Sequence, residues 1–384
     1  MVNAHTRGWV TAAALLALGC SPMMDGMMEG SPADAGARDA WPPGTDGARP
    51  MVDVGVRDAE PVDAEPVDAV APAPREGLRI NQVQMRATVN SYHASLVPGV
   101  VDEFSYDHLR LAEQAEQQGV RVFDLDVRGD RVSFMAISPA TDEHVVDRWN
   151  NCSERMNPPG DIIGCLWNLR EWLEANPEHP LVIILVGESE LLERRSQMMH
   201  QLGELESQLA IGLDRERLLT PGDVRGAHPT LWHALQAGGW PTVEATRGKV
   251  MLVLNDRGVV RARYLLTGGD DPENRLLFII GDPELEGDPA LRDEVVFTFE
   301  PPVVRQFESD MARLPRMRAL VEAGYLVHAI TDDAERARRL RAEGVHFVGT
   351  RFPDEVFGPL DGSPTTCNPI TAPADCRADQ IEPP

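Results

Sequence analysis

The chain of 384 residues contains few cysteines, few aromatic residues and almost no lysine. Lys249 is the only lysine among the 36 basic residues, and 61 acidic residues bring the formal net charge to −25. Such an acidic balance disfavours binding to nucleic-acid phosphates and also the binding of a polybasic segment to anionic lipid. Hydrophobic residues still make up 42 %, which is enough for a substantial core. The length fits two average domains or one α/β barrel of roughly 250 residues or more.

The first twenty residues have the pattern of an export signal. Arg7 precedes an apolar run over residues 9–18, which ends in Ala-Leu-Gly-Cys with the cysteine at position 20. This run is too short to span a bilayer permanently, and its small final residues are typical of a cleavage site. Because Cys20 follows Leu-Gly as in a bacterial lipobox, we expect a signal peptide over residues 1–19 and a lipid on Cys20. Ser21 is typical of lipoproteins of the outer membrane. An ordinary signal peptide, removed together with Cys20, is the alternative.

The other four cysteines form two close pairs along the chain. In an oxidising compartment, an even number of cysteines at short spacings predicts the local disulfides Cys152–Cys165 and Cys367–Cys376. A metal site is the alternative. However, the sequence has no Cys-x-x-Cys spacing, so a zinc cluster of thiolates fits it poorly.

Residues 20–77 have the composition of a tether. Between positions 21 and 76 there are nine prolines, twelve acidic residues and four arginines, and a Pro-Val-Asp-Ala-Glu repeat covers residues 61–69. So few apolar side chains cannot offset the entropy of an ordered chain. We therefore expect residues 20–77 to be extended and disordered.

From residue 78 onward, apolar runs rich in β-branched residues alternate with amphipathic stretches. The expected strands cover residues 80–87, 120–127, 132–137, 181–186, 249–254, 276–280, 295–299, 325–330 and 346–349. The expected helices cover residues 109–118, 162–175, 191–211, 304–323 and 334–343. Such alternation predicts a mostly parallel sheet that is covered by helices on both sides. Around eight strands over roughly 300 residues favour a TIM-type barrel, which would form a single domain over residues 78–384.

Polar residues follow three of these strands, at the barrel end that carries functional groups. Asn90 comes after the first strand, Asp124 and Asp126 end the second, and Glu188 follows the strand over residues 181–186. Asp124 and Asp126 are two residues apart, so both are expected to face the barrel interior. Two like charges facing a core need a cation or an arginine to neutralise them. The four residues together predict an oxygen-only site suited to Ca²⁺, with arginine partners as the alternative.

Several segments resemble, in the same order, the bacterial Ca²⁺-dependent phosphatidylinositol-specific phospholipase C family. Thr88–His93 resembles its Thr-His-Asn-Ser-Tyr-His motif, and Phe123–Val127 resembles its aromatic-Glu-x-Asp-Val strand. Further similar segments lie within Cys165–Pro180, Gly239–Val250 and Cys367–Cys376. The resemblance implies the barrel of the phospholipase C-like phosphodiesterases, cleavage of a lipid phosphodiester and dependence on Ca²⁺.

The same resemblance locates two departures from the family pattern. The two histidines that the family uses for proton transfer are replaced here by Val89 and Ala136. Each proton transfer contributes ~10²–10⁴-fold to the rate, so impaired catalysis is expected. His93 and His144 are the nearest substitutes. A structural role is expected for His93, which matches a residue already present beside the catalytic one, and a surface loop is expected for His144.

Taken together, these patterns predict an exported, lipid-anchored barrel at the outer membrane of a bacterial cell envelope. Its expected function is the phosphodiester-lipid chemistry of the family in impaired form, with a phosphoinositide or another phosphodiester as ligand. The alternative is a non-catalytic cell-surface protein that binds a ligand or a partner at the barrel mouth, which is the end of the barrel where the carboxyl ends of its strands lie. No nucleic acid is expected as a partner.

Overall fold

The computed structural model of the chain describes residues 77–94, 106–129, 134–136, 162–187, 198–255, 264, 275–281, 304–308, 311–360 and 362–382. The signal peptide, Cys20, the tether up to residue 76, His144, Cys152 and Glu188 lie outside these ranges. The predictions made for them therefore stay predictions. Within the described ranges, every helix is too short or too polar to cross a membrane.

Eight parallel strands form a closed ring. They are β1 (Val83–Thr88), β2 (Val120–Gly129), β4 (Val182–Gly187), β6 (Val250–Leu254), β7 (Leu277–Gly281), β8 (Val304–Glu308), β9 (Leu326–Ile330) and β10 (Phe347–Thr350). Each strand pairs with the next one in this order, and β1 pairs with both β2 and β10. The fold is therefore the TIM-type barrel that the alternation of strands and helices predicts.

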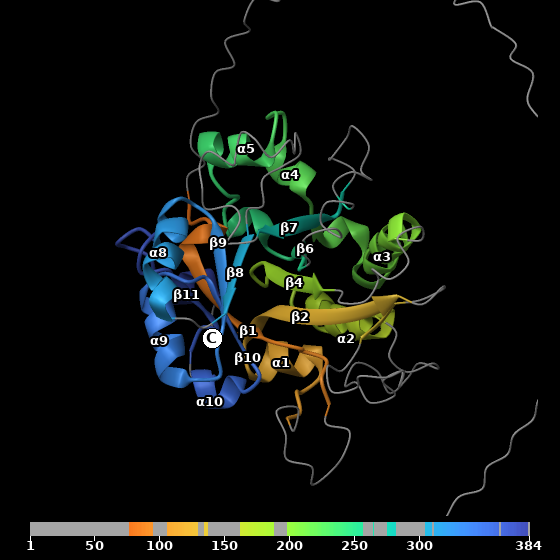
Figure 1. The fold of residues 1–384 in the computed structure, drawn as a ribbon, viewed down its shortest axis with the longest axis horizontal. Coiled ribbons are helices and arrows are strands. Elements are labelled where there is room, and N and C mark those ends of the chain that lie inside the picture. Colours follow the sequence, from red (N-terminus) through yellow and green to blue (C-terminus); the bar gives the residue numbers. More distant parts are fainter. Residues whose placement is uncertain are drawn as a thin grey trace, which may run out of the picture. The chain divides into compact units, whose positions relative to one another are not determined.

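Helices cover the outside of this ring (Figure 1). They are α1 (Leu111–Gln117), α2 (Ile162–Ala175), α3 (Met198–Leu213), α4 (Pro221–Arg225), α5 (Leu231–Gly238), α8 (Leu314–Glu322), α9 (Ala334–Ala342), α10 (Pro353–Phe357) and α11 (Ala378–Ile381). Polar caps define several of their starts. Thr230 accepts a hydrogen bond from the backbone N–H of His233 at the start of α5, and Asp333 accepts one from Arg336 at the start of α9.

Alternation along the strands separates an inner core from an outer one. On β9, Leu326 joins the cluster of buried residues that fills the barrel, whereas Val327 and Ala329 pack against α8 and α9. On β2, Val122 joins the inner cluster, while Phe123 and Leu125 pack outside. Because side chains alternate with a period of two, every other residue after Leu326 and Val122 also faces the interior.

One expected element is corrected by the structure. The segment over residues 304–323, expected as one helix, begins as strand β8 and becomes helical only at α8. Its opening Val-Arg-Gln-Phe-Glu has apolar residues three apart, as in a helix, but it pairs with both β7 and β9 and completes the ring. Tertiary pairing therefore overrides the local pattern. The expected strand over residues 295–299 lies outside the described ranges.

A strand is present where one was expected over residues 132–137, but it is not part of the ring. Its described part, β3 (Phe134–Ala136), pairs antiparallel with β2, with Ala136 opposite Val127. Four residues between β2 and β3 are too few for the crossover that a parallel pair requires, so the two form a hairpin. Ala136 therefore lies on a ribbon at the end of β2 and not on a strand of the ring.

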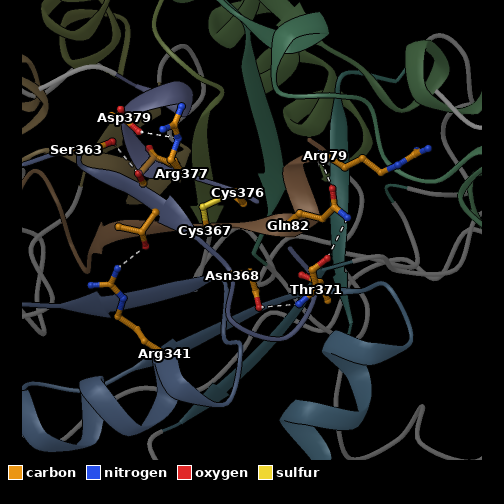
Figure 2. Close-up of a disulfide and its surroundings, with 12 residues drawn as sticks. Arg79, Gln82, Arg341, Ser363, Cys367, Asn368, Thr371, Cys376, Arg377 and Asp379 are labelled. Carbon is orange, nitrogen blue, oxygen red and sulfur yellow. Dashed lines mark hydrogen bonds and ion pairs between the residues drawn. A yellow bond between two sulfur atoms is a disulfide. The ribbon is translucent and has the colours of Figure 1, made fainter. Parts of the chain in front are cut away.

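The segment after β10 lies alongside β1. Strand β11 (Thr365–Cys367) pairs antiparallel with β1, and Cys367 forms the predicted disulfide with Cys376 (Figure 2). Asn368 holds the turn that follows, because its Nδ2 donates to the carbonyl of Gly344 at 2.7 Å. Cys165 is also disulfide-bonded. Its predicted partner, Cys152, is one of the residues that the structure does not describe.

A buried ion pair connects this C-terminal segment to the barrel. The guanidinium of Arg121 on β2 donates to the Glu382 carboxylate through Nε at 2.9 Å and also through Nη2. The second carboxylate oxygen of Glu382 accepts a hydrogen bond from Thr365 Oγ1 at 2.9 Å. Both charged side chains are at least 90 % buried. Each therefore depends on the other for its neutralisation.

We expect Arg121→Met to lower the free energy of unfolding by about 3–5 kcal/mol, because it leaves the Glu382 carboxylate buried without a cation. Denaturant titration of the purified protein measures this loss. The matched control is Arg338→Met, which removes a guanidinium whose salt bridge to Glu335 is exposed and should cost less than about 1 kcal/mol. Equal losses in the two variants would contradict a special role for the buried pair.

Candidate functional site

The inner face of the barrel becomes polar at the carboxyl ends of its strands. Asp124 and Asp126 follow Val122 on the inward face of β2, where they pair with Leu185 and Gly187 of β4. A Cβ added to Gly187 would lie 2.8 Å from Oδ1 of Asp126, which is closer than real Cβ contacts. The Asp126 carboxylate therefore occupies space that Gly187 leaves open by having no side chain.

The turn after β1 holds Asp124 from the neighbouring strand. Asn90 has a φ of 49°, a left-handed conformation that asparagine tolerates better than most residues. In this turn the backbone N–H of Asn90 donates to the Asp124 carboxylate. Ser91 contributes two further bonds, since its N–H donates to the Asp124 carbonyl at 2.8 Å and its Oγ accepts from the Asp124 N–H at 2.9 Å. Asn90, Asp124 and Asp126 therefore lie together, as their strand positions suggest.

Asn255 is a further residue of the site, and the sequence analysis missed it. It follows β6 directly, and its Nδ2 donates to Oδ1 of Asp124 over 3.4 Å. Its side chain also lies beside Gly187, because a Cβ added to Gly187 would be 3.8 Å from the Cβ of Asn255. The available signal was its place immediately after the strand over residues 249–254, at the end where the other polar residues gather.

Burial raises the pKa values of both carboxyl groups. Burial is the larger cause for Asp124, and the nearby charge of Asp126 adds to it, so its pKa is well above the usual range. Burial raises the pKa of Asp126 to about 6. Among the described residues, no arginine, lysine or histidine forms a salt bridge with either carboxylate, so the arginine alternative is not seen there.

The donor set of this site suits a hard cation. Two carboxylates with raised pKa values favour a bound positive charge, and carboxylate and amide oxygens are the ligands that Ca²⁺ prefers. Within the described ranges, there is no group of three or more histidine, cysteine, aspartate or glutamate residues that could hold a metal ion. The site there consists of Asp124 and Asp126, with the amides of Asn90 and Asn255 beside them. Glu188, the fourth expected ligand, follows β4 outside the described residues.

The expected proton-transfer positions are occupied as follows. Val89 lies between the end of β1 and the turn at Asn90, and its carbonyl is hydrogen-bonded to Nε2 of His108 at 2.9 Å. Ala136 ends β3, and His144 lies outside the described residues. His93 is buried, and its ring packs against Tyr106 with the ring centroids 4.3 Å apart. That contact gives His93 a packing role in the loop after β1.

An aromatic and charged cluster borders the same turn. The Tyr106 hydroxyl accepts a hydrogen bond from Nδ2 of Asn90 at 3.1 Å, and burial raises the pKa of Tyr106 to about 12. The Arg351 guanidinium lies 5.8 Å from the Tyr106 ring centroid. Its Nε also donates to Oδ2 of Asp332 at 2.7 Å. Asp332 thus balances the positive charge of Arg351 beside the turn.

Comparison with known proteins places this closed barrel among the phospholipase C-like phosphodiesterases. Residues 156–346 match the family model described as "Phosphoinositide phospholipase C, Ca2+-dependent". The chain belongs to this family. The matched region begins after β2, so Asn90, Asp124 and Asp126 precede it. A search of curated protein sequences found no match.

Solved structures with the same fold include Ca²⁺-dependent bacterial enzymes. A phosphoinositol-specific phospholipase C from a Pseudomonas species, in complex with myoinositol, is 14 % identical, covers 76 % of this chain and 96 % of its own, and has a TM-score of 0.56. A phosphatidylinositol-specific phospholipase C from Streptomyces antibioticus is 18 % identical, covers 73 % of this chain and 98 % of its own, and has a TM-score of 0.54. At these identities the likeness shows the shared fold.

Asp126→Asn is expected to stabilise the protein in the presence of a chelator at pH 7, because it removes one of two desolvated like charges. A pKa of about 6 against a usual 3.8 corresponds to at most about 3 kcal/mol. Partial exposure of Asp126 screens part of this energy, so we expect a gain of about 1–2 kcal/mol. Thermal and denaturant unfolding measure it.

The pH dependence supplies the control for this prediction. Between pH 4 and about 6 the folded wild type holds a proton that the unfolded chain has released, so its stability falls as the pH rises through this window. Asp126→Asn should lose part of that fall, whereas Asp379→Asn, which changes an exposed carboxylate, should retain all of it. Parallel pH profiles for all three proteins would show that Asp126 carries no repulsion.

Proposed function

We propose that this chain binds the headgroup of a phosphodiester lipid at the barrel mouth, together with Ca²⁺, and cleaves the phosphodiester only slowly. The observation that carries the proposal is the pair of carboxylates, buried Asp124 and half-buried Asp126, which has no cationic partner among the described residues. A bound cation would satisfy this pair and would also attract the phosphate of a headgroup. Membership of a Ca²⁺-dependent phospholipase C family supports that choice of ligand.

Asp124 and Asp126 are the residues that would hold the ion, with the amide of Asn90 and, from the sequence, Glu188 as further oxygen donors. When bound, Ca²⁺ supplies positive charge for the orientation and stabilisation of a phosphoryl group. The chain itself supplies the rigid support. Asn255 and the backbone N–H of Asn90 both donate to the Asp124 carboxylate, which fixes its direction before any ligand arrives.

Slow cleavage is expected because the positions that would transfer protons hold Val89 and Ala136. Attack of a headgroup hydroxyl on phosphorus needs one group to take up the hydroxyl proton and another to protonate the leaving oxygen. The family resemblance assigns these two roles to the positions of Val89 and Ala136, and neither side chain can transfer a proton. The ring of His93 packs against Tyr106, and this contact supports a packing role for His93. Both replacements therefore support impaired turnover.

A purely binding role is the second candidate. In that case the mouth holds a ligand or a protein partner at the cell surface and breaks no bond. The simultaneous replacement at positions 89 and 136 favours this candidate, since the loss of either group alone would already slow the reaction by ~10²–10⁴-fold. The two candidates differ in whether a product is released.

Val89→His is expected to raise the rate of headgroup release by about 10²-fold or more, because it returns a proton acceptor to the mouth. The measurement is the release of water-soluble inositol phosphate from phosphatidylinositol vesicles at millimolar Ca²⁺. Val89→Asn has a similar size and no basic nitrogen, and it should leave the rate unchanged. The combined variant Val89→His with Asp126→Asn should fall back to the background.

The outcomes separate the two candidates. Vesicle binding that depends on Ca²⁺, with measurable release by Val89→His, supports the impaired enzyme. Binding with no release from either protein supports the binding role. If neither Ca²⁺ nor phosphatidylinositol vesicles bind, and if Ca²⁺ also leaves the melting temperature unchanged, the lipid-headgroup proposal is wrong.

We further propose that the chain is held at the bacterial envelope by a lipid on Cys20. This proposal rests on the export signal over residues 1–19 and on the composition of the tether. Cys20→Ala should move the protein from the membrane pellet to the soluble fraction after cell lysis and centrifugation. Ser21→Asp, which keeps Cys20, should remain in the pellet but shift from outer to inner membrane in a density gradient. Pelleting of Cys20→Ala with outer membranes would refute the anchor.

A further inference from the structure

His328 is a buried histidine inside the barrel that no role described so far explains. It lies on β9 between Val327 and Ala329, which pack on the outer helices, and two residues after Leu326, which belongs to the inner cluster. The alternation of the strand therefore directs His328 into the barrel. Its side chain has no exposed surface.

Both ring nitrogens of His328 lack a hydrogen-bond partner among the described residues. His346 shows the usual solution on the next strand. Its Nδ1 accepts from the N–H of Val327 at 3.1 Å, and its Nε2 is hydrogen-bonded to the carbonyl of Asn81 at 2.9 Å. A buried polar group that stays unpartnered lowers stability, so natural interiors rarely contain one. The His328 imidazole is therefore arranged for a partner that the described chain does not supply.

The ring is directed toward the mouth. In the strand ladder His328 pairs with Phe347. Gly349 lies two residues further along β10, nearer the mouth, and a Cβ added to Gly349 would lie only 2.7 Å from Nε2 of His328. A methyl carbon of Val89 lies 3.0 Å from the position of that added Cβ. His328, Gly349 and Val89 thus meet at one place, and Val89 immediately precedes the turn at Asn90 that holds Asp124.

We infer that the imidazole of His328, whose ring occupies the space left by Gly349, hydrogen-bonds a hydroxyl group of a polyol ligand bound at the barrel mouth. This inference rests on the proposed headgroup function and names a residue that selects the ligand. A hydroxyl both donates and accepts, and the neutral imidazole does the same through its two nitrogens. A phosphate at neutral pH only accepts, so it could pair only with the donating nitrogen, whereas a hydroxyl can pair with either nitrogen. Access requires a rotation of the Val89 side chain about χ1.

The protonation state agrees with this chemistry. Burial lowers the pKa of His328 to about 4, so the ring is neutral at pH 7. Besides Val89 and Gly349, the residues beside it on the neighbouring strands are Phe347 of β10 and Gln306 of β8, and neither of these is charged. A neutral ring in such surroundings selects for uncharged polar groups of a ligand and not for its anionic ones.

The test is calorimetric titration of the full-length protein with myo-inositol and with inositol 1-phosphate in the presence of Ca²⁺. His328→Phe keeps a ring of similar size and removes both nitrogens. We expect it to weaken binding of both probes by about tenfold and to leave the melting temperature unchanged or higher, because an unpartnered polar group is lost. His328→Gln, which retains a donor and an acceptor, should recover part of the affinity.

His346→Phe is the matched control, because His346 is equally buried but has both nitrogens bonded within the chain. It should lower the melting temperature and leave the affinity of the folded fraction unchanged. If His328→Phe binds both probes as tightly as the wild type, the inference is wrong. A loss confined to inositol 1-phosphate would overturn the hydroxyl contact in favour of the phosphate. If the wild type itself binds neither probe nor vesicles, the proposed function fails, and this inference fails with it.

Discussion

The hydrogen bonds between β1 and β2 are the contact on which the rest of the mouth depends. Arg86 pairs with Val120 and Ala87 with Val122, and these pairs turn an open sheet into a ring. The register irregularity between Arg86 and Ala87 lies directly below the turn that contains Asn90. Closure therefore brings this turn against Asp124, where the bonds from Asn90 and Ser91 tie the two strands together again. Without the closing pair, the carboxylate would have no support on that side.

The closed ring also determines which chemical groups meet. Its interior is filled largely by apolar side chains such as Met85, Leu185 and Phe347, and carboxylates, an amide and an imidazole lie toward the carboxyl ends of the strands. Two glycines shape this polar layer. Gly187 leaves room for the Asp126 carboxylate, and Gly349 leaves room for the His328 ring. This polar layer lies beside Val89, whose side chain cannot transfer a proton.

The sequence predicts much of the scaffold and less of its mouth. Strands with strong apolar runs, such as β4 and β6, and helix α2 appear within one residue of their expected bounds, because burial on both sides imposes a continuous pattern. β8 was expected as part of a helix, because only its neighbours β7 and β9 make it a strand. The pairing of β3 was also missed, since an apolar run alone does not distinguish a ring strand from a hairpin.

The candidate site shows the same division. Asp124 and Asp126 can be recognised from a spacing of two within a strand, which places both on one face. Asn255 and His328 cannot be recognised in that way, because their roles depend on which strand ends lie side by side and on the absence of a side chain at Gly187 or Gly349. Departures at Val89 and Ala136 are visible only beside the family pattern, since neither residue is unusual for its local structure.

The link between Arg121 and Glu382 has a consequence for the order in which the chain acquires its structure. Arg121 is needed early, in the second strand of the ring, yet its neutralising carboxylate lies 261 residues later. One edge of β1 likewise stays unpaired until β10 has been synthesised. A partly synthesised chain consequently lacks the partner of Arg121 and leaves one edge of β1 unpaired. The barrel can become stable only once almost its whole length is available. Its stable folding is therefore a late event that requires the C-terminal segment.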